Sequence, residues 1–172
     1  MKKIILFLFA ALLIQNICIA KDKLEFAFPN DGWHKVASPD GIEAKKCYVP
    51  YNQSSENYTE MLIFVEKKSV TNPAAIMQKQ LGKDMLNYND IIPEYVRASY
   101  DDAMATWCSR AKNTCAIHRT FFGKDGIIIA TYINKMPHYS QNMFGQWSNI
   151  LNGISLYNSE ITSEIKKSII EL

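Results

Sequence analysis

One stretch, residues 104–133, constrains the fold of this 172-residue chain more than any other. Two apolar segments rich in aromatic and β-branched residues flank a turn that contains Gly123 and Gly126, and a shorter segment ending at Trp107 and Cys108 precedes them. This pattern is typical of three successive antiparallel strands. We therefore expect a meander here, at the centre of one sheet in one small domain.

The first twenty residues have the three-part pattern of a secretory signal peptide. Lys2 and Lys3 are followed by an apolar run over residues 4–14, by polar residues, and by the small residue Ala20. The run is shorter than the roughly 20 apolar residues that a membrane-spanning helix needs. We expect cleavage between Ala20 and Lys21, so that the protein is exported to the periplasm or secreted from a bacterial cell.

The charge balance excludes some classes of partner. Removing Lys2 and Lys3 from the 19 basic residues leaves 17, equal to the 17 acidic residues, and both kinds are dispersed along the chain. Nucleic-acid-binding domains are usually basic, with Lys and Arg clustered on one face. The sequence therefore argues against a nucleic-acid partner and against polybasic attachment to a membrane.

A first amphipathic helix is expected before the meander. Met77, Leu81, Met85 and Tyr88 recur at helical spacing. Asn72 precedes a proline, which suits an N-cap followed by the first helical position. The apolar segments at residues 24–28, 33–37, 42–49, 59–66 and 95–97 are expected to be strands, with 59–66 covered on both faces.

Two further helices are expected after the meander. Residues 141–152 repeat Phe144, Trp147 and Leu151 on one face, and this helix should lie across the sheet. In the tail, isoleucines spaced four apart favour a third helix over residues 159–172, which either docks a partner or covers its own sheet.

These elements define the fold class as α+β, an antiparallel β-sheet flanked by amphipathic helices. One domain is expected over residues 21–157, followed by a helical tail over residues 158–172. The chain contains no internal repeat, low-complexity block or linker that would divide the domain.

The order of elements resembles the fold of the PsbP/Mog1/DcrB family. The resemblance rests on the segment Phe26 to Pro29 with Trp33, on residues 61–65, on the helix after Pro73, and on the stretches 104–133 and 144–156. It implies a β-sheet flanked by helices in a non-enzymatic module that binds protein partners. The cysteine pair of the meander and the isoleucine-rich tail depart from the family pattern, and no functional residue is carried over.

Three cysteines remain after signal removal, Cys47, Cys108 and Cys115. Disulfides persist in the oxidising compartments that exported proteins enter. The pair Cys108–Cys115 is favoured as a structural disulfide across a hairpin, because redox-active pairs usually have two intervening residues rather than six. Cys47 is then left over, although a bond from Cys47 to one of the other two, or to another chain, stays open.

The catalytic alternatives are weaker. Cys47 is a candidate nucleophile, with His118 or His34 as base and Asp101 as the orienting acid. The simpler interpretation is a buried thiol that packs as a small apolar group. His34, His118 and His138 lack the spacing of metal ligands, so we expect no metal and no cofactor.

The leading hypothesis is an exported, non-enzymatic binding module that acts through protein–protein contacts. Tyrosines beside predicted loops and strand ends, such as Tyr51, Tyr95 and Tyr100, suit a partner surface. One alternative is a small secreted effector or virulence factor that acts on a host molecule. The weaker alternative is a thiol-dependent enzyme that uses Cys47.

Overall fold

The computed structural model describes residues 23–28, 32–68, 71–123, 126–135, 141–156 and 168–171. The expected signal peptide and its cleavage site between Ala20 and Lys21 lie outside these residues, as do His138 and residues 157–167. The elements are β1 Lys23–Phe26, β2 Trp33–Val36, β3 Lys46–Pro50, β4 Glu60–Lys67, α2 Pro73–Asn87, β5 Glu94–Ala98, β6 Asp102–Ser109, β7 Thr114–Phe122, β8 Ile127–Asn134, α3 Gln141–Gly153, β9 Ser155–Leu156 and β10 Ser168–Glu171.

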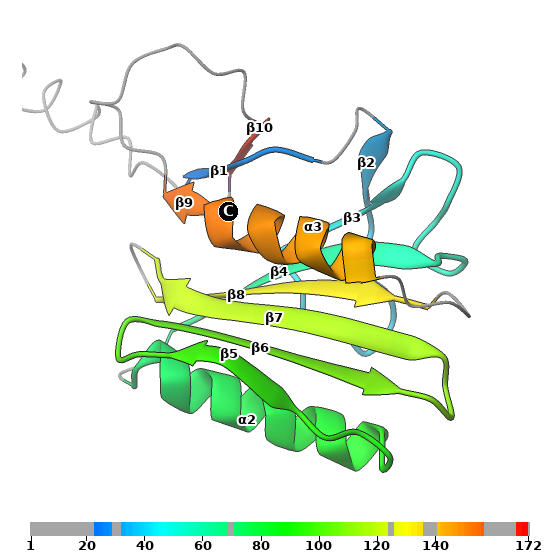
Figure 1. Ribbon diagram of the computed structural model, residues 1–172. Helices are drawn as coiled ribbons and strands as arrows, with labels where there is room; N and C mark the ends of the chain where they lie inside the picture. The colour runs from blue at the N-terminus through cyan, green and yellow to red at the C-terminus, as the bar shows by residue number, and fades with distance from the viewer. Residues whose placement is uncertain are drawn as a thin grey trace, which may run out of the picture.

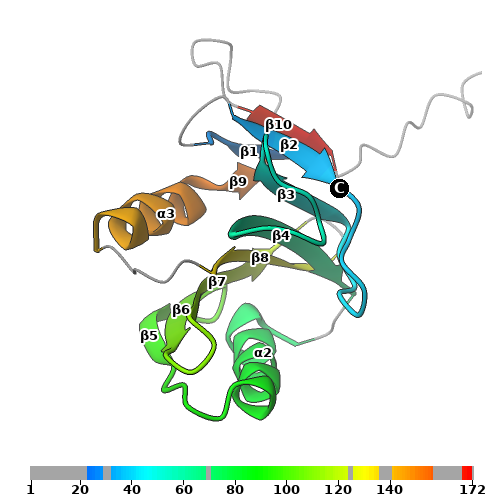
Figure 2. The ribbon, with the colours of Figure 1, turned by 90° about the vertical axis from the view of Figure 1, so that its right-hand side faces the viewer.

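The main sheet has seven antiparallel strands in the order β2-β3-β4-β8-β7-β6-β5. Helix α2 lies on one face and α3 on the other (Figures 1 and 2). The predicted meander is confirmed as β6, β7 and β8, and β8 is the central strand. Among the described residues, neither helix is long and apolar enough to cross a membrane.

Successive side chains of β7 pack on opposite faces of the sheet. Ile117 packs into the cluster beneath α3, whereas its neighbour Ala116 packs into the cluster beneath α2. Successive side chains of a strand point to opposite faces, so each face receives every second residue. The predicted strand over residues 59–66 is β4, and it is buried on both faces from Met61 to Phe64.

A second, three-stranded sheet has the order β10-β1-β9 and contributes Leu24 and Phe26 to the core on the α3 face. The expectation of a helix through the end of the tail is therefore wrong for residues 168–171, which pair with β1 in the register Leu24 to Ile170. Consecutive β-branched Ile169 and Ile170 favour a strand. An available backbone edge on β1 outweighs the four-residue spacing of the isoleucines.

Helix α2 begins as predicted, with the Asn72 side chain accepting a hydrogen bond from the Ala75 amide at 2.9 Å. Met77 and Leu81 are buried against the sheet, but Met85 is 51% exposed, so the predicted apolar face is wrong at that position. The next buried residue of this face is Asp84. A carboxylate can occupy this place because the sheet offers it hydrogen-bond donors.

Helix α3 covers the opposite face with Trp147 and Leu151, both buried as the periodicity predicts. The Trp147 ring stacks on Tyr132 of β8 with centroids 4.0 Å apart. Arg119 of β7 reaches the end of α3, where its Nη1 donates to the carbonyl oxygens of Leu151 at 2.7 Å and Asn152 at 3.1 Å. A cation at this position also complements the negative end of the helix dipole.

Gly126 is required by a close approach between two strand connections. A Cβ atom at this position would lie 2.5 Å from the carbonyl oxygen of Lys67, at the end of β4. Lys67 pairs with Ile127 in the β4–β8 register, so any larger residue at position 126 would push these central strands apart.

Candidate functional site

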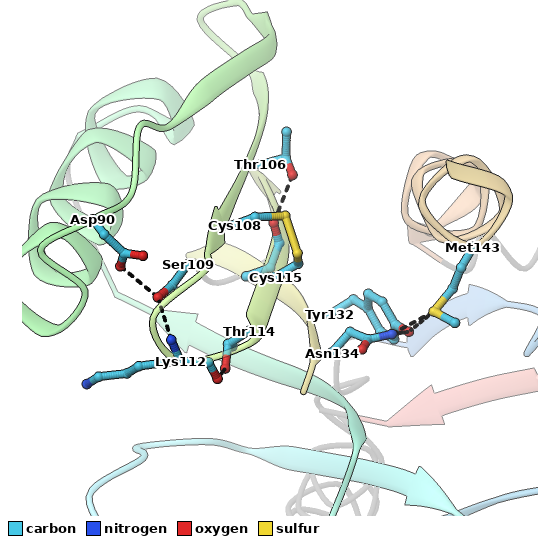
Figure 3. The surroundings of a disulfide bond; sticks show 11 residues. Asp90, Thr106, Cys108, Ser109, Lys112, Thr114, Cys115, Tyr132, Asn134 and Met143 are labelled. Carbon is cyan, nitrogen blue, oxygen red and sulfur yellow. Dashed lines mark hydrogen bonds between the residues drawn. A yellow bond between two sulfur atoms is a disulfide. The ribbon is translucent and has the colours of Figure 1, made fainter. Parts of the chain in front are cut away.

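Cys108 and Cys115 form a disulfide, the pairing that the sequence favours. They stand opposite each other in the β6–β7 register, with Cα atoms 4.0 Å apart (Figure 3). A ring of this size stabilises the fold by about 2.5 kcal/mol on the chain-entropy estimate. The bond also indicates an oxidising compartment.

The turn beyond the disulfide is held by Asp90. Its carboxylate accepts a hydrogen bond from the Ser109 hydroxyl at 2.7 Å (Figure 3). It also accepts one from the Ala111 amide at 2.9 Å. The Ala111 amide, followed by Ser109, lowers the pKa of this carboxyl. Asn113 adopts a left-handed conformation with φ of 47°, which asparagine tolerates better than most residues. This corner of the molecule is therefore a defined turn.

Cys47 is a free thiol on β3 and is only 1% exposed. Burial raises its pKa, and a hydrogen bond with Ser38 opposes this only in part. A nucleophilic cysteine needs an accessible thiolate. The geometry therefore gives the hypothesis of a Cys47-dependent enzyme no support.

Of the other proposed partners of Cys47, His34 lies on the neighbouring strand, two residues from Val36, which pairs with Cys47, whereas Asp101 lies in a distant turn. His34 of β2 pairs with Val49, and its ring lies 5.7 Å from that of Tyr51. Asp101 lies in the turn before β6 and accepts a hydrogen bond from Ser99 at 2.8 Å. In the part of the chain that the structure describes, no hydrogen bond joins either residue to Cys47.

His118 belongs instead to a buried polar cluster between α2 and the sheet. Its Nε2 lies 2.9 Å from Asp84 Oδ2, and its Nδ1 lies 2.8 Å from Thr131 Oγ1. The indole nitrogen of Trp107 lies 2.9 Å from the same Asp84 oxygen, and Gln80 donates to the other oxygen at 3.0 Å. Three donor side chains, from Trp107, His118 and Gln80, thus surround the buried Asp84 carboxylate.

The hydrogens of this cluster can be assigned by counting donors and acceptors. Trp107 Nε1 also lies 3.0 Å from His118 Nε2, but the indole nitrogen can only donate. An unprotonated Nε2 would turn its lone pair toward the Asp84 carboxylate, which is unfavourable. We therefore place a hydrogen on Nε2, so that Trp107 and His118 both donate to Asp84, and in the neutral imidazole Nδ1 accepts from the Thr131 hydroxyl.

The sequence did not point to Asp84, Trp107 or Thr131. The available signal was Asp84 itself, since it falls three residues after Leu81 on the apolar face of a predicted amphipathic helix. A carboxylate at such a position is costly unless it is hydrogen-bonded. Among the described residues, no cluster of three or more His, Cys, Asp or Glu side chains is arranged to hold a metal ion.

A second candidate surface is the edge of the sheet at β5. Among the described strands, β5 pairs with β6 alone, and its side chains are mostly exposed. Tyr95 is 49% exposed and Val96 is 51% exposed. A register shift between Tyr95 and Arg97 leaves Val96 without a partner on β6. We call residues 94–98 the β5 edge.

Beside the β5 edge lies a hollow of about 780 Å³, which we call the edge groove. Pairing of β5 with β6 starts at Glu94 and Thr106, so the end of β6 that carries Cys108 is not covered by β5. Ile92, which is 83% exposed, and Arg110 are among the residues that line the groove. The structure thus places apolar and charged side chains next to a sheet edge and the disulfide.

Comparison with known proteins adds no assignment. No protein-family model matches the sequence, and no curated protein matches it. The class that the structure defines is an α+β protein, a seven-stranded antiparallel sheet with two helices packed on it.

Proposed function

We propose that this chain is an exported, non-enzymatic binding module that takes up an extended segment of a partner protein along the β5 edge. The observation that carries the proposal is an outer strand with exposed apolar side chains, Tyr95 and Val96, at the end of the sheet. A strand in this position offers unpaired backbone donors and acceptors to another chain.

The binding mode is strand addition, in which main-chain hydrogen bonds supply affinity and neighbouring pockets supply specificity. The edge groove is the neighbouring pocket. Ile92 offers an apolar contact there, while Glu94 and Arg110 provide opposite charges that can orient a polar segment. The matching partner is an extended peptide that alternates apolar and polar residues.

The β5 edge has few of the features that protect edge strands from association. Lysine or proline within the strand commonly serves this purpose, but β5 has neither. Its one basic residue, Arg97, is committed to Asp102, with Nη2 at 2.9 Å from the carboxylate, and to Asn152. The bulge at Val96 remains as a local irregularity and turns an apolar side chain outward.

Export is part of this proposal. The signal-like residues 1–20 and the disulfide between Cys108 and Cys115 both favour the periplasm or the extracellular space. The resemblance of the element order to the PsbP/Mog1/DcrB family, whose implied role is partner binding, is also part of the proposal.

Site-specific photocrosslinking in the native cell tests the proposal. A photoreactive phenylalanine derivative at Tyr95 should capture a protein in the envelope or the culture medium, and Val96→Lys should abolish the capture because an edge lysine opposes strand addition. The matched control places the same derivative at Tyr51, which is 80% exposed and lies just after β3. Equal capture from both positions, or capture unaffected by Val96→Lys, would contradict the proposal.

A further inference from the structure

A separate cavity lies on the α2 face of the sheet, away from the function proposed for the β5 edge. Helix α2 packs on β6, β7 and β8, whereas the connection between β2 and β3 descends beside β3 and β4 on the same side (Figure 2). Between them is a cleft of about 380 Å³, which we call the α2 cleft. This volume falls in the range of about 300–1,000 Å³ that is usual for small-molecule sites.

The floor of the α2 cleft is apolar. Ile63 and Val65 of β4 and Ile129 and Ile133 of β8 line it. The register pairs Val65 with Ile129, so these side chains lie next to one another on one face of adjacent strands. A ligand in this cleft therefore needs an apolar body.

The cleft also has a polar side, formed by the buried cluster. His118, Thr131 and Asp84 line it, and they are 2%, 8% and 7% exposed. In the neutral Nε2–H tautomer assigned above, the Nδ1 atom of His118 accepts from the Thr131 hydroxyl, 2.8 Å away. The Thr131 oxygen then keeps its lone pairs as acceptors, so the polar side calls for a hydrogen-bond donor on the ligand.

The charges of the cleft indicate a neutral ligand. The lining contains two acidic side chains, Glu43 and Asp84, and two basic ones, Lys67 and Lys83. Lys67 and Glu43 form an ion pair at 2.8 Å, and the Asp84 carboxylate is occupied by Trp107, His118 and Gln80. With two acidic and two basic side chains, the lining carries no net formal charge that would favour a charged head group of either sign.

We infer that the α2 cleft binds a neutral small molecule with an apolar body and one hydroxyl group, such as an alcohol or a phenol, which donates to Thr131. The alternative use of the polar cluster is purely structural, as an anchor that holds α2 to the sheet. The two roles differ in what they predict for ligand selectivity, because an anchor has no reason to prefer a hydroxyl over hydrogen.

Nuclear magnetic resonance of the folded protein can test this with two matched probes, 4-propylphenol and propylbenzene. The chain has three tryptophans, and the indole N–H signal of Trp107, which lines the cleft, should shift on addition of the phenol. Those of Trp33 and Trp147 should stay in place. One hydrogen bond should make the phenol bind about fivefold to tenfold more tightly than propylbenzene.

Variants at Thr131 and Val65 complete the test. Thr131→Ser keeps a hydroxyl and should keep the preference, whereas Thr131→Val should bring the two affinities together without loss of propylbenzene binding. Val65→Trp leaves the polar cluster intact and should block both probes by filling the cleft. Absence of a Trp107 shift, equal affinities in the wild type, or a preference that survives Thr131→Val overturns the inference. If Thr131→Val does not fold, continued binding of the phenol to Val65→Trp overturns it.

Discussion

Asp84 Oδ2 and His118 Nε2 lie 2.9 Å apart across the interface between α2 and β7. This contact joins a helix to a strand of the meander, and it does so through a carboxylate that is 7% exposed. Trp107 and Gln80 also donate hydrogen bonds to this carboxylate. Position 84 would suit an apolar residue, but here these polar contacts attach α2 to the sheet.

Asp84→Asn should lower the free energy of unfolding by about 1–3 kcal/mol, because the amide nitrogen replaces an acceptor and leaves a buried donor unsatisfied. Lys79→Asn on the exposed side of α2 is the control and should change stability by no more than about 0.5 kcal/mol. Urea unfolding followed by tryptophan fluorescence measures both. Equal effects would show that the Asp84 contacts carry no net stability.

Replacing Cys108 and Cys115 together with serine should lower the free energy of unfolding by about 2.5 kcal/mol, since the closed ring no longer restricts the unfolded chain. The matched control is wild-type protein treated with a reductant under the same conditions, which should give the same urea midpoint as the double variant. A wild-type midpoint that does not move on reduction would contradict the expectation.

The carboxyl group of Glu60 in β4 makes the free energy of unfolding depend on pH. Burial raises its pKa above the ordinary value of 4.5, and a hydrogen bond with Tyr132 opposes the shift. A raised pKa means that the folded state favours the protonated carboxyl. The resulting stabilisation is complete below pH 4.5 and is lost as the pH rises through the folded-state pKa.

Glu60→Gln should therefore raise the melting temperature relative to the wild type at pH 7, and the difference should shrink at pH 4. Glu56→Gln, at an exposed position in the preceding loop, is the control and should show neither effect. Calorimetric melting at the two pH values decides, and a lower melting temperature of Glu60→Gln at pH 7 would count against the role of burial.

Cys47 should resist alkylation by iodoacetamide in the native protein and react readily in denaturant. The reason is its burial, which both blocks access and raises the thiol pKa. Peptide mapping by mass spectrometry measures the labelled fraction. Rapid native labelling would revive the hypothesis of a reactive thiol.

Periodicity was a good guide to the elements whose side chains pack on one face. The meander, the cap at Asn72 and the face of α3 around Trp147 all follow from the sequence, because strands and helices repeat their apolar residues at fixed intervals. The helix expected at residues 168–171 failed because strand pairing with β1 depends on a distant segment. Local spacing cannot reveal a hydrogen-bonding edge far along the chain.

The candidate sites were harder to predict for the same reason. Asp84, Trp107 and Thr131 come from α2, β6 and β8, and only the folded sheet brings them to His118. The β5 edge is a matter of strand order, since β5 contains neither the lysine nor the proline that commonly marks an edge strand.

The three-stranded sheet has a consequence for biosynthesis. Its middle strand, β1, precedes all seven strands of the main sheet in the chain, whereas both of its partners, β9 and β10, follow them. Leu24 and Phe26 therefore gain their strand partners only after the main sheet's residues have been synthesised. The small sheet can therefore close only after every strand of the main sheet has been made.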